Sequence, residues 1–142
     1  MGNETANLAG GSEYDDDYPT CAATYATLRI YTGKMPPEQV TGLLRLEPSK
    51  LQVEGAGAHL NGWFLSTKER VESRDIRRHV DWLLQQIFPL RSELAALQAR
   101  PGIRMDVFCY WRSTQGHGGP LLTPKQMRPL ANLDLEIGFD CY

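Results

Sequence analysis

The chain has 142 residues, of which 42% are hydrophobic and 23% are charged, and its formal net charge is −2 at pH 7. This length is sufficient for one domain with a substantial core. No apolar run approaches the ~20 residues that span a bilayer, and the first residues lack the basic and apolar segments of a secretory signal. These features predict a cytoplasmic protein and exclude a helical membrane protein.

The acidic residues are concentrated at the start of the chain. Residues 1–20 contain five acidic residues and no basic residue, which leaves 12 acidic and 15 basic residues in 21–142. Because the first segment has little apolar content to offset the entropy of ordering, we expect 1–20 to be a disordered acidic arm and 21–142 to be a single domain. The net charge of +3 on this domain is too small to indicate a nucleic-acid-binding protein.

The first half of the domain shows strand patterns around one short helix. Residues 24–31 alternate between apolar and polar side chains, which predicts a strand with one covered face. Two prolines, Pro36 and Pro37, suit the first turn of a short helix. A pair of strands is expected at 51–54 and 62–67, and the pattern of the second leaves open which of its faces is buried.

The longest pattern is helical and covers 73–99. Its apolar residues recur at steps of three and four, which places them on one stripe of a helix: Ile76, Val80, Leu83, Leu84, Ile87, Leu90, Leu94 and Leu97. We expect Ser73 or Asp75 to cap this helix and Pro89 to kink or split it.

The last third predicts a strand, a short helix and a strand. Residues 103–112 alternate strictly, and 113–120 form a Gly-rich loop. Thr123 and Gln126 have the spacing of a capping box, and Pro129 is expected to end the helix early. The alternation over 133–142 predicts a closing strand that is central or well paired. Together these elements predict an α+β fold. The expected arrangement is a ferredoxin-like split βαβ antiparallel sheet, with the long helix across one face and an added C-terminal helix and strand.

The face of the sheet opposite the helices is the first candidate binding surface. Tyrosine and arginine are enriched at binding hot spots, and the alternation places the following residues on this face: Tyr25, Arg29, Tyr31, Arg104, Asp106, Phe108, Tyr110, Arg112, Asp134, Glu136 and Asp140. The alternative is a solvated face on which Arg29 and Arg104 pair across strands with Asp106 and Glu136.

The start of the long helix and the Gly-rich loop form a second candidate surface. Four arginines gather there, Arg70, Arg74, Arg77 and Arg78, where they could hold an anion. The simpler interpretation is local pairing, for example of Arg77 with Asp81. The loop 116–119 carries His117 and Gly118, and it suits either a ligand contact or a turn that needs positive φ.

The histidines and cysteines do not form a recognisable catalytic or metal-binding motif. His79 and Asp75 are four residues apart on the helix and could form an oriented imidazole, but no nucleophile stands at a diagnostic spacing. The three histidines lack metal-ligand spacing, so we expect no metal and no cofactor. The cysteines are Cys21, Cys109 and Cys141; we expect no structural disulfide, and burial of the latter two.

Several segments together resemble a known bacterial family. They are NGWFLST, SRDIRRHVDWLL, CYWRSTQGHGGP and LANLDLEIGFDCY, and the family is the one catalogued as domain of unknown function 4279. The resemblance covers about residues 23–142. The positions that match those characteristic of the family are Trp63, Ser73, His79, Trp111, Gly118, Gly119 and Asp140. Because the family has no established activity, the resemblance supports the fold and adds almost nothing on function.

These patterns favour a non-catalytic module that binds a protein partner, in the manner of an immunity or inhibitor protein, or a second copy of itself. The expected site is the open sheet face with the adjoining loop 116–119. The alternative is an enzyme or a protein that binds a small ligand or anion between Arg74, Arg78, His79 and His117. A nucleic-acid role is disfavoured because the aromatic and basic residues are interleaved with acids.

Overall fold

The structure is a computed structural model, and it describes residues 13–55 and 60–142. Most of the expected arm, 1–12, and part of the Gly-rich link, 56–59, lie outside the described residues. The elements in chain order are β1 (Cys21–Gly33), α1 (Glu38–Leu44), β2 (Lys50–Gln52), β3 (Asn61–Ser66), α2 (Ile76–Ile87), η1 (Phe88–Leu90), α3 (Arg91–Gln98), β4 (Arg104–Ser113), α4 (Pro124–Asn132) and β5 (Ile137–Cys141).

The strands form one five-stranded sheet in the order β2-β3-β1-β4-β5. The central strand β1 pairs antiparallel with β3 and β4, and β2 pairs antiparallel with β3. The expectation of a wholly antiparallel sheet is wrong, because β5 runs parallel to β4. The connection through α4 carries the chain back to the start of β4, and such a crossover joins parallel strands. The α+β class is confirmed, with a mixed sheet.

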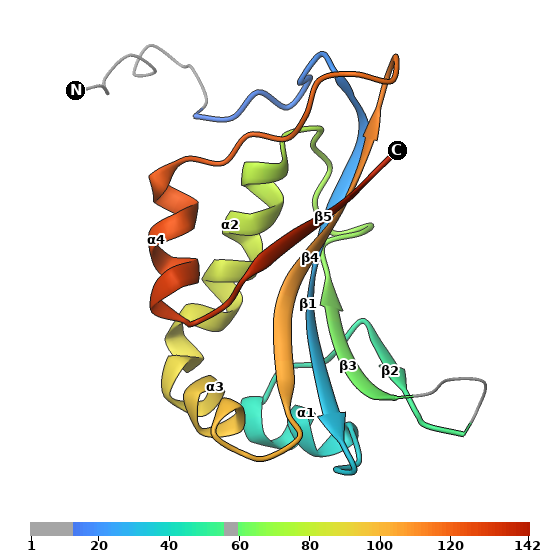
Figure 1. The fold of residues 1–142 in the computed structure, drawn as a ribbon. Coiled ribbons are helices and arrows are strands. Elements are labelled where there is room, and N and C mark those ends of the chain that lie inside the picture. Colours follow the sequence, from blue (N-terminus) through green and yellow to red (C-terminus); the bar gives the residue numbers. More distant parts are fainter. Residues whose placement is uncertain (1–12, 56–59) are drawn as a thin grey trace.

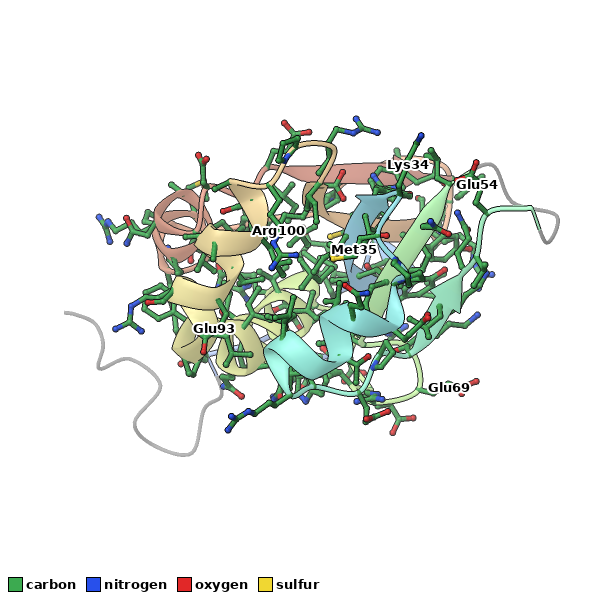
Figure 2. The ribbon with its side chains drawn as sticks, turned by 90° about the horizontal axis from the view of Figure 1, so that it is seen from below. Lys34, Met35, Glu54, Glu69, Glu93 and Arg100 are labelled. Carbon is green, nitrogen blue, oxygen red and sulfur yellow. The ribbon has the colours of Figure 1, made fainter. Side chains whose placement is uncertain are left out.

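The helices lie on one face of the sheet, and the core fills the space between the two layers (Figure 1). From the sheet, this core receives Leu28 of β1 and Trp63 of β3, and the stripe of α2 covers them. The inner face of β3 is therefore the one carrying Trp63 and Leu65, and Phe64 points to the opposite face. Viewed from below, Met35 and Arg100 lie beside each other near the end of the core (Figure 2), where the Arg100 guanidinium contacts the Met35 sulfur at 3.5 Å.

The expected split of the long helix at Pro89 is confirmed. The chain passes from α2 through the 3₁₀ turn η1, which contains Pro89, into α3. Asp75 is the N-cap of α2, and its carboxylate accepts a hydrogen bond from the Arg77 amide at 3.0 Å. This cap satisfies one of the free amides of the first turn. No described helix is long and apolar enough to cross a membrane.

Two expectations about the C-terminal region are wrong. The helix α4 does not end at Pro129 but continues to Asn132, stabilised by its capping box and by burial of Leu130. The closing strand is shorter than expected and lies at the edge of the sheet, where β5 pairs only with β4. Leu133 and Leu135 are buried in the turn before it, in which Asp134 takes a φ of 59°.

The described part of the expected arm packs against the domain. Tyr14 donates a hydrogen bond to Asp81 of α2, and Asp16 pairs with Arg78 of α2. Glu13 pairs with Lys125 of α4. Residues 13–20 therefore make defined contacts with the helical layer, which corrects the expectation of a disordered arm for this stretch.

Candidate functional site

The sheet surface that the helices leave uncovered is formed by alternate residues of all five strands. Because successive side chains in a strand point to opposite faces, burial of Ala26, Leu28 and Ile30 against the helices turns their neighbours outward. We call this surface the open face. It comprises Tyr25, Thr27, Arg29, Tyr31, Lys50, Gln52, Phe64, Ser66, Asp106, Phe108, Tyr110, Glu136 and Asp140, with Lys68 at its rim.

A bidentate ion pair occupies the middle of the open face. The Arg29 guanidinium donates to both Asp106 carboxylate oxygens, at 2.8 and 2.7 Å, across the β1–β4 pairing. The same guanidinium lies over the Phe108 ring, 4.1 Å from its centroid. The hydrogen bonds that Arg29 donates to Asp106 raise the pKa of Arg29. The expected cross-strand pairing is therefore confirmed for Arg29, and both charges are fixed within the sheet.

Aromatic rings surround this ion pair. Tyr25 and Tyr110 stack with centroids 5.2 Å apart, and Tyr31 meets Phe64 edge to face at 5.7 Å. Such pairs hold the rings in fixed orientations. Gly138 makes room for Phe108, since a Cβ at this glycine would lie 3.2 Å from the ring. The result is a pre-organised aromatic surface rather than a set of free side chains.

The open face is hollowed in two adjoining places. One hollow of about 500 Å³ lies over the middle of the sheet, between Phe64, Phe108 and Tyr110. A second, of about 620 Å³, lies at the end of β1 and β4 and is bounded by the turn before β5. Arg29 and Tyr31 line both hollows, so the two adjoin each other.

The structure brings most of the residues predicted for this surface together. Arg29, Tyr31 and Tyr110 line the central hollow, and Arg104 lines the second one. Arg112 is exposed at the far end of β4 and lines neither hollow. Six members of the open face are absent from the predicted list, namely Thr27, Lys50, Gln52, Phe64, Ser66 and Lys68. The alternation of β3 left open whether Phe64 or Trp63 faces outward. The positions of Lys50 and Lys68 on the open face depend on how the strands pair.

The arginines at the start of α2 pair with acidic residues, several of them far away in the sequence. Arg78 binds the Asp16 carboxylate with two hydrogen bonds, at 2.8 and 3.1 Å, and Arg74 pairs with Asp17 at 3.0 Å. The hydrogen bonds from Arg78 and Ser73 lower the pKa of Asp16. Residues 13–20, which we call the acidic stretch, thus pair with the arginines for which the sequence suggested an anion site.

Arg77 forms a local pair, but with a different acid from the one expected. It binds Asp75 with its guanidinium, the shortest contact being 2.6 Å, and not Asp81. Burial, the largest influence, favours the neutral form of Asp75. Hydrogen bonds from Arg77 and from the Asp15 amide outweigh it and lower the pKa of this carboxyl.

His79 is a buried structural residue. Its side chain is 1% exposed, and it does not pair with Asp75 as expected. The Ser73 carbonyl can only accept a hydrogen bond, so Nε2 donates to it at 2.8 Å, and Nδ1 accepts from the Thr67 hydroxyl at 2.6 Å. Burial lowers the pKa of His79 and keeps the ring neutral. Both ring nitrogens are thus engaged in holding α2 against the end of β3.

The Gly-rich loop contacts the acidic stretch instead of His79. The Tyr18 hydroxyl donates to the Gly119 carbonyl at 2.9 Å, and Gly118, at a φ of 87°, packs against Thr20. Gly118 therefore fills the role of a turn residue with positive φ, which is one of the two expectations for this loop. His117 is exposed. Residues 18–20 thus lie against the loop, while Asp16 and Asp17 contact the start of α2.

One comparison with known proteins identifies the chain. The family described as a domain of unknown function (DUF4279) matches residues 22–142. The chain belongs to the DUF4279 family. No curated protein and no solved structure matches it. The acidic stretch that covers the start of α2 precedes the DUF4279 match.

The positions that carry the resemblance to DUF4279 have mostly structural surroundings. Trp63 is fully buried, and its indole N–H donates to the Thr41 hydroxyl at 3.0 Å. Trp111 is 2% exposed, and Ser73 and His79 belong to the hydrogen bonds described above. Asp140 differs from these residues because it is exposed and stands on the open face, opposite Tyr110.

The DUF4279 domain has no evident metal site in the part that the structure describes, where no group of three or more His, Cys, Asp or Glu residues could hold an ion. All three cysteines are free, in agreement with the expectation of no structural disulfide. Burial raises the pKa of Cys109 to about 12, which keeps this thiol protonated. Cys141 is exposed, and the expectation that it is buried is wrong.

Proposed function

We propose that this DUF4279 domain is a non-catalytic protein-binding module that holds its partner on the open face. The observation that carries the proposal is the composition of that face. Fixed aromatic rings and an internally paired Arg29 form a surface with two adjoining hollows that no described helix covers. Tyrosine and arginine in pre-oriented positions are typical of binding hot spots.

We also propose that the fold is ferredoxin-like, and the order of the strands supports this. In the sheet, β3 lies between β1 and β2 and runs antiparallel to both, and β4 flanks β1 on its other side. This strand order is compatible with a split βαβ unit to which α4 and β5 are added. Helices on one side and an uncovered sheet on the other suit a domain that docks through its sheet.

A capture experiment with matched variants tests the proposal. The full chain is immobilised as wild type, Arg29→Ala, Tyr110→Ala and Met127→Ala, and bound proteins from the lysate of its natural host are quantified by mass spectrometry. Met127 is 48% exposed on α4 in the helical layer, so its truncation serves as the control. We expect a partner that Met127→Ala retains and that the two sheet variants lose. Retention by correctly folded sheet variants, checked by circular dichroism, would exclude the open face.

The basic cluster at the start of α2 supports a second candidate function, binding of a small anion. Its specific support is that Arg74 and Arg78 already bind carboxylates, those of Asp17 and Asp16. Replacing both acids by asparagine in the full chain leaves the arginines without these partners. Titration of the double variant with inorganic phosphate should then give measurable heat that the wild type lacks. If the two proteins respond equally, the cluster only anchors the acidic stretch.

A further inference from the structure

We propose that the partner recognised by the open face is a second copy of this chain, related to the first by a two-fold axis parallel to β1. This inference rests on the proposed function and names the occupant of the same surface. It follows from the distribution of charge across the strands. The basic side of the face in one copy can lie against the acidic side in a second copy.

The first part of the evidence is a row of residues that crosses the sheet at Arg29. Lys50 of β2 pairs with Phe64, Phe64 pairs with Arg29, and Arg29 pairs with Asp106. Glu136 adjoins Asp106, since its carbonyl accepts the amide of the next residue, Val107, at 3.0 Å. The row therefore begins with one basic residue, Lys50, at the β2 edge and ends with one acidic residue, Glu136, at the β5 side.

A second row, which crosses the sheet at Tyr25, has the same polarity. The Lys68 ammonium lies 5.5 Å from the centroid of the Tyr25 ring, at the β3 side of the row. Tyr25 pairs with Tyr110, and Tyr110 pairs with Asp140 of β5. Both rows thus carry a positive charge on one side of the sheet and a negative charge on the other. The Arg29–Asp106 pair lies in the middle of the first row, and the stacked Tyr25 and Tyr110 rings lie in the middle of the second.

The symmetry of the sheet fixes the orientation of the second copy. In the order β2-β3-β1-β4-β5, the strand β1 is central, and β2 and β5 are the two edges. A two-fold axis parallel to β1 exchanges the edges and keeps each row opposite itself, so Lys50 of one copy faces Glu136 of the other. An axis perpendicular to the strands would place β2 on β2 and bring like charges together. Only the parallel axis gives an isologous contact with complementary charge.

The edge charges are available for this contact. Among the ion pairs of the described residues, Arg29 and Asp106 are joined to each other, and neither Lys50 nor Glu136 takes part in any. Both residues are exposed. The Arg29–Asp106 pair thus neutralises the middle of the first row, whereas Lys50 and Glu136 at its two ends carry opposite charges that remain to be paired.

The size of the open face sets the expected strength of the dimer. The five strands are about 4.8 Å apart, so the sheet is about 20 Å wide, and its edge strand β2 is only three residues long. Such a face is small beside the ~800 Å² of accessible surface that each partner contributes to a standard stable interface. We therefore expect a reversible dimer with a dissociation constant on the order of 10 to 100 μM. Its edge pairs are exposed, so it should weaken as salt rises.

Sedimentation equilibrium of the full chain, from about 10 to 500 μM protein at low and high salt, tests the inference. The variants are Lys50→Glu, Glu136→Lys and the double exchange. Each single reversal places like charges at both symmetry-related contacts and should weaken the dimer at least about tenfold. Arg128→Glu on α4 changes the net charge by the same amount as Lys50→Glu and should leave the dimer unchanged.

Mixing the two single variants is the decisive step. In a mixed dimer, the new carboxylate of the Lys50→Glu copy would meet the new ammonium of the Glu136→Lys copy, while the native Glu136 and Lys50 would meet at the second contact. An equimolar mixture and the double exchange should therefore both dimerise like the wild type. A wild type that stays monomeric at the highest concentration, or a mixture that fails to recover, would overturn the inference. If capture of a different protein still depends on Tyr110 in that case, the proposed function survives; if it does not, both fail.

Discussion

The hydrogen bond between Tyr14 and Asp81 gives the sharpest test of how the acidic stretch is held. Asp81 is 7% exposed on α2, and its carboxylate accepts from the Tyr14 hydroxyl at 2.5 Å and from Gln126 at 3.0 Å. The Lys125 ammonium lies 3.8 Å from the same carboxylate. Burial and the bond to Asp81 together raise the pKa of Tyr14, which favours the protonated hydroxyl that donates this bond.

Replacement of Tyr14 by phenylalanine removes the hydroxyl and keeps the ring. A hydrogen bond to a charged acceptor contributes about 1.5 to 3 kcal/mol, and loss of the donor leaves a buried carboxylate with fewer partners. Because Tyr14 itself is only half-buried and water can reach its side of the contact, we expect a loss of about 1 to 2 kcal/mol in the free energy of unfolding. In a domain of this size that loss lowers the melting temperature by roughly 3 to 8 °C.

The measurement is urea denaturation of the full chain, followed by tryptophan fluorescence and checked by calorimetry. Tyr18→Phe is the matched control, because the Tyr18 hydroxyl donates to a neutral carbonyl, that of Gly119, and its loss should cost only about 0.5 to 1 kcal/mol. If Tyr14→Phe changes the free energy of unfolding by less than Tyr18→Phe does, the bond to Asp81 does not anchor the acidic stretch on α2. If neither variant changes it, residues 13–20 behave as the flexible arm that their composition suggests.

Three further outcomes are expected from urea denaturation. The neutral His79 binds a proton only when unfolded, because its pKa is lowered in the fold. Its contribution is therefore complete above the unfolded pKa of ~6.5 and is lost below it by up to about 1.4 kcal/mol per pH unit, so the difference between wild type and His79→Gln should shrink from pH 7.5 to 5.5. Gly138→Val should cost about 1 to 3 kcal/mol because its Cβ would crowd Phe108, whereas Gly119→Ala meets open space and should cost less. Leu83→Ala, at a core position that is 1% exposed, should cost about 2 to 5 kcal/mol.

The elements that the sequence predicted well are those whose signals are local. The alternation of β1 and β4 placed the correct residues against the helices, and the stripe of α2 and α3 identified the core face. Pro89 marked the break between the two helices, because a proline lacks the amide that the helix needs. Each of these signals depends on residues within about ten positions of one another.

The predictions that failed concern segments whose local sequence pattern fits two different structures. The alternation from Leu133 to Cys141 has the period of a strand, but Leu133 and Leu135 are buried by a turn in which Asp134 adopts positive φ. Pro129 is tolerated because the capping box and the burial of Leu130 keep α4 in place despite the lost donor. The parallel direction of β5 likewise follows from the path of α4 and not from any residue in the strand.

The sequence predicted many residues of the open face, but it did not predict how those residues are arranged. Alternation identified Arg29, Tyr31 and Tyr110 as neighbours on one face, yet the opposite charges of its edges appear only once the strand order places β2 and β5 on the two sides. In the same way, the pairing of Arg78 with Asp16 joins residues 62 positions apart, so the sequence offered only nearer partners. Strand register and long-range ion pairs are properties of the folded chain.

The two charged surfaces of this domain, the start of α2 and the open face, differ in how many of their charges are already paired within the chain. At the start of α2, Arg74 and Arg78 are paired with acids of the same chain, so an external anion must first displace a tethered competitor. Tethering gives such a competitor a high effective concentration. On the open face, internal pairing is confined to the centre, and the exposed Lys50 and Glu136 belong to no ion pair of the described residues. The free energy of pairing these edge charges is therefore available only to a second molecule, which is why we assign recognition to the sheet.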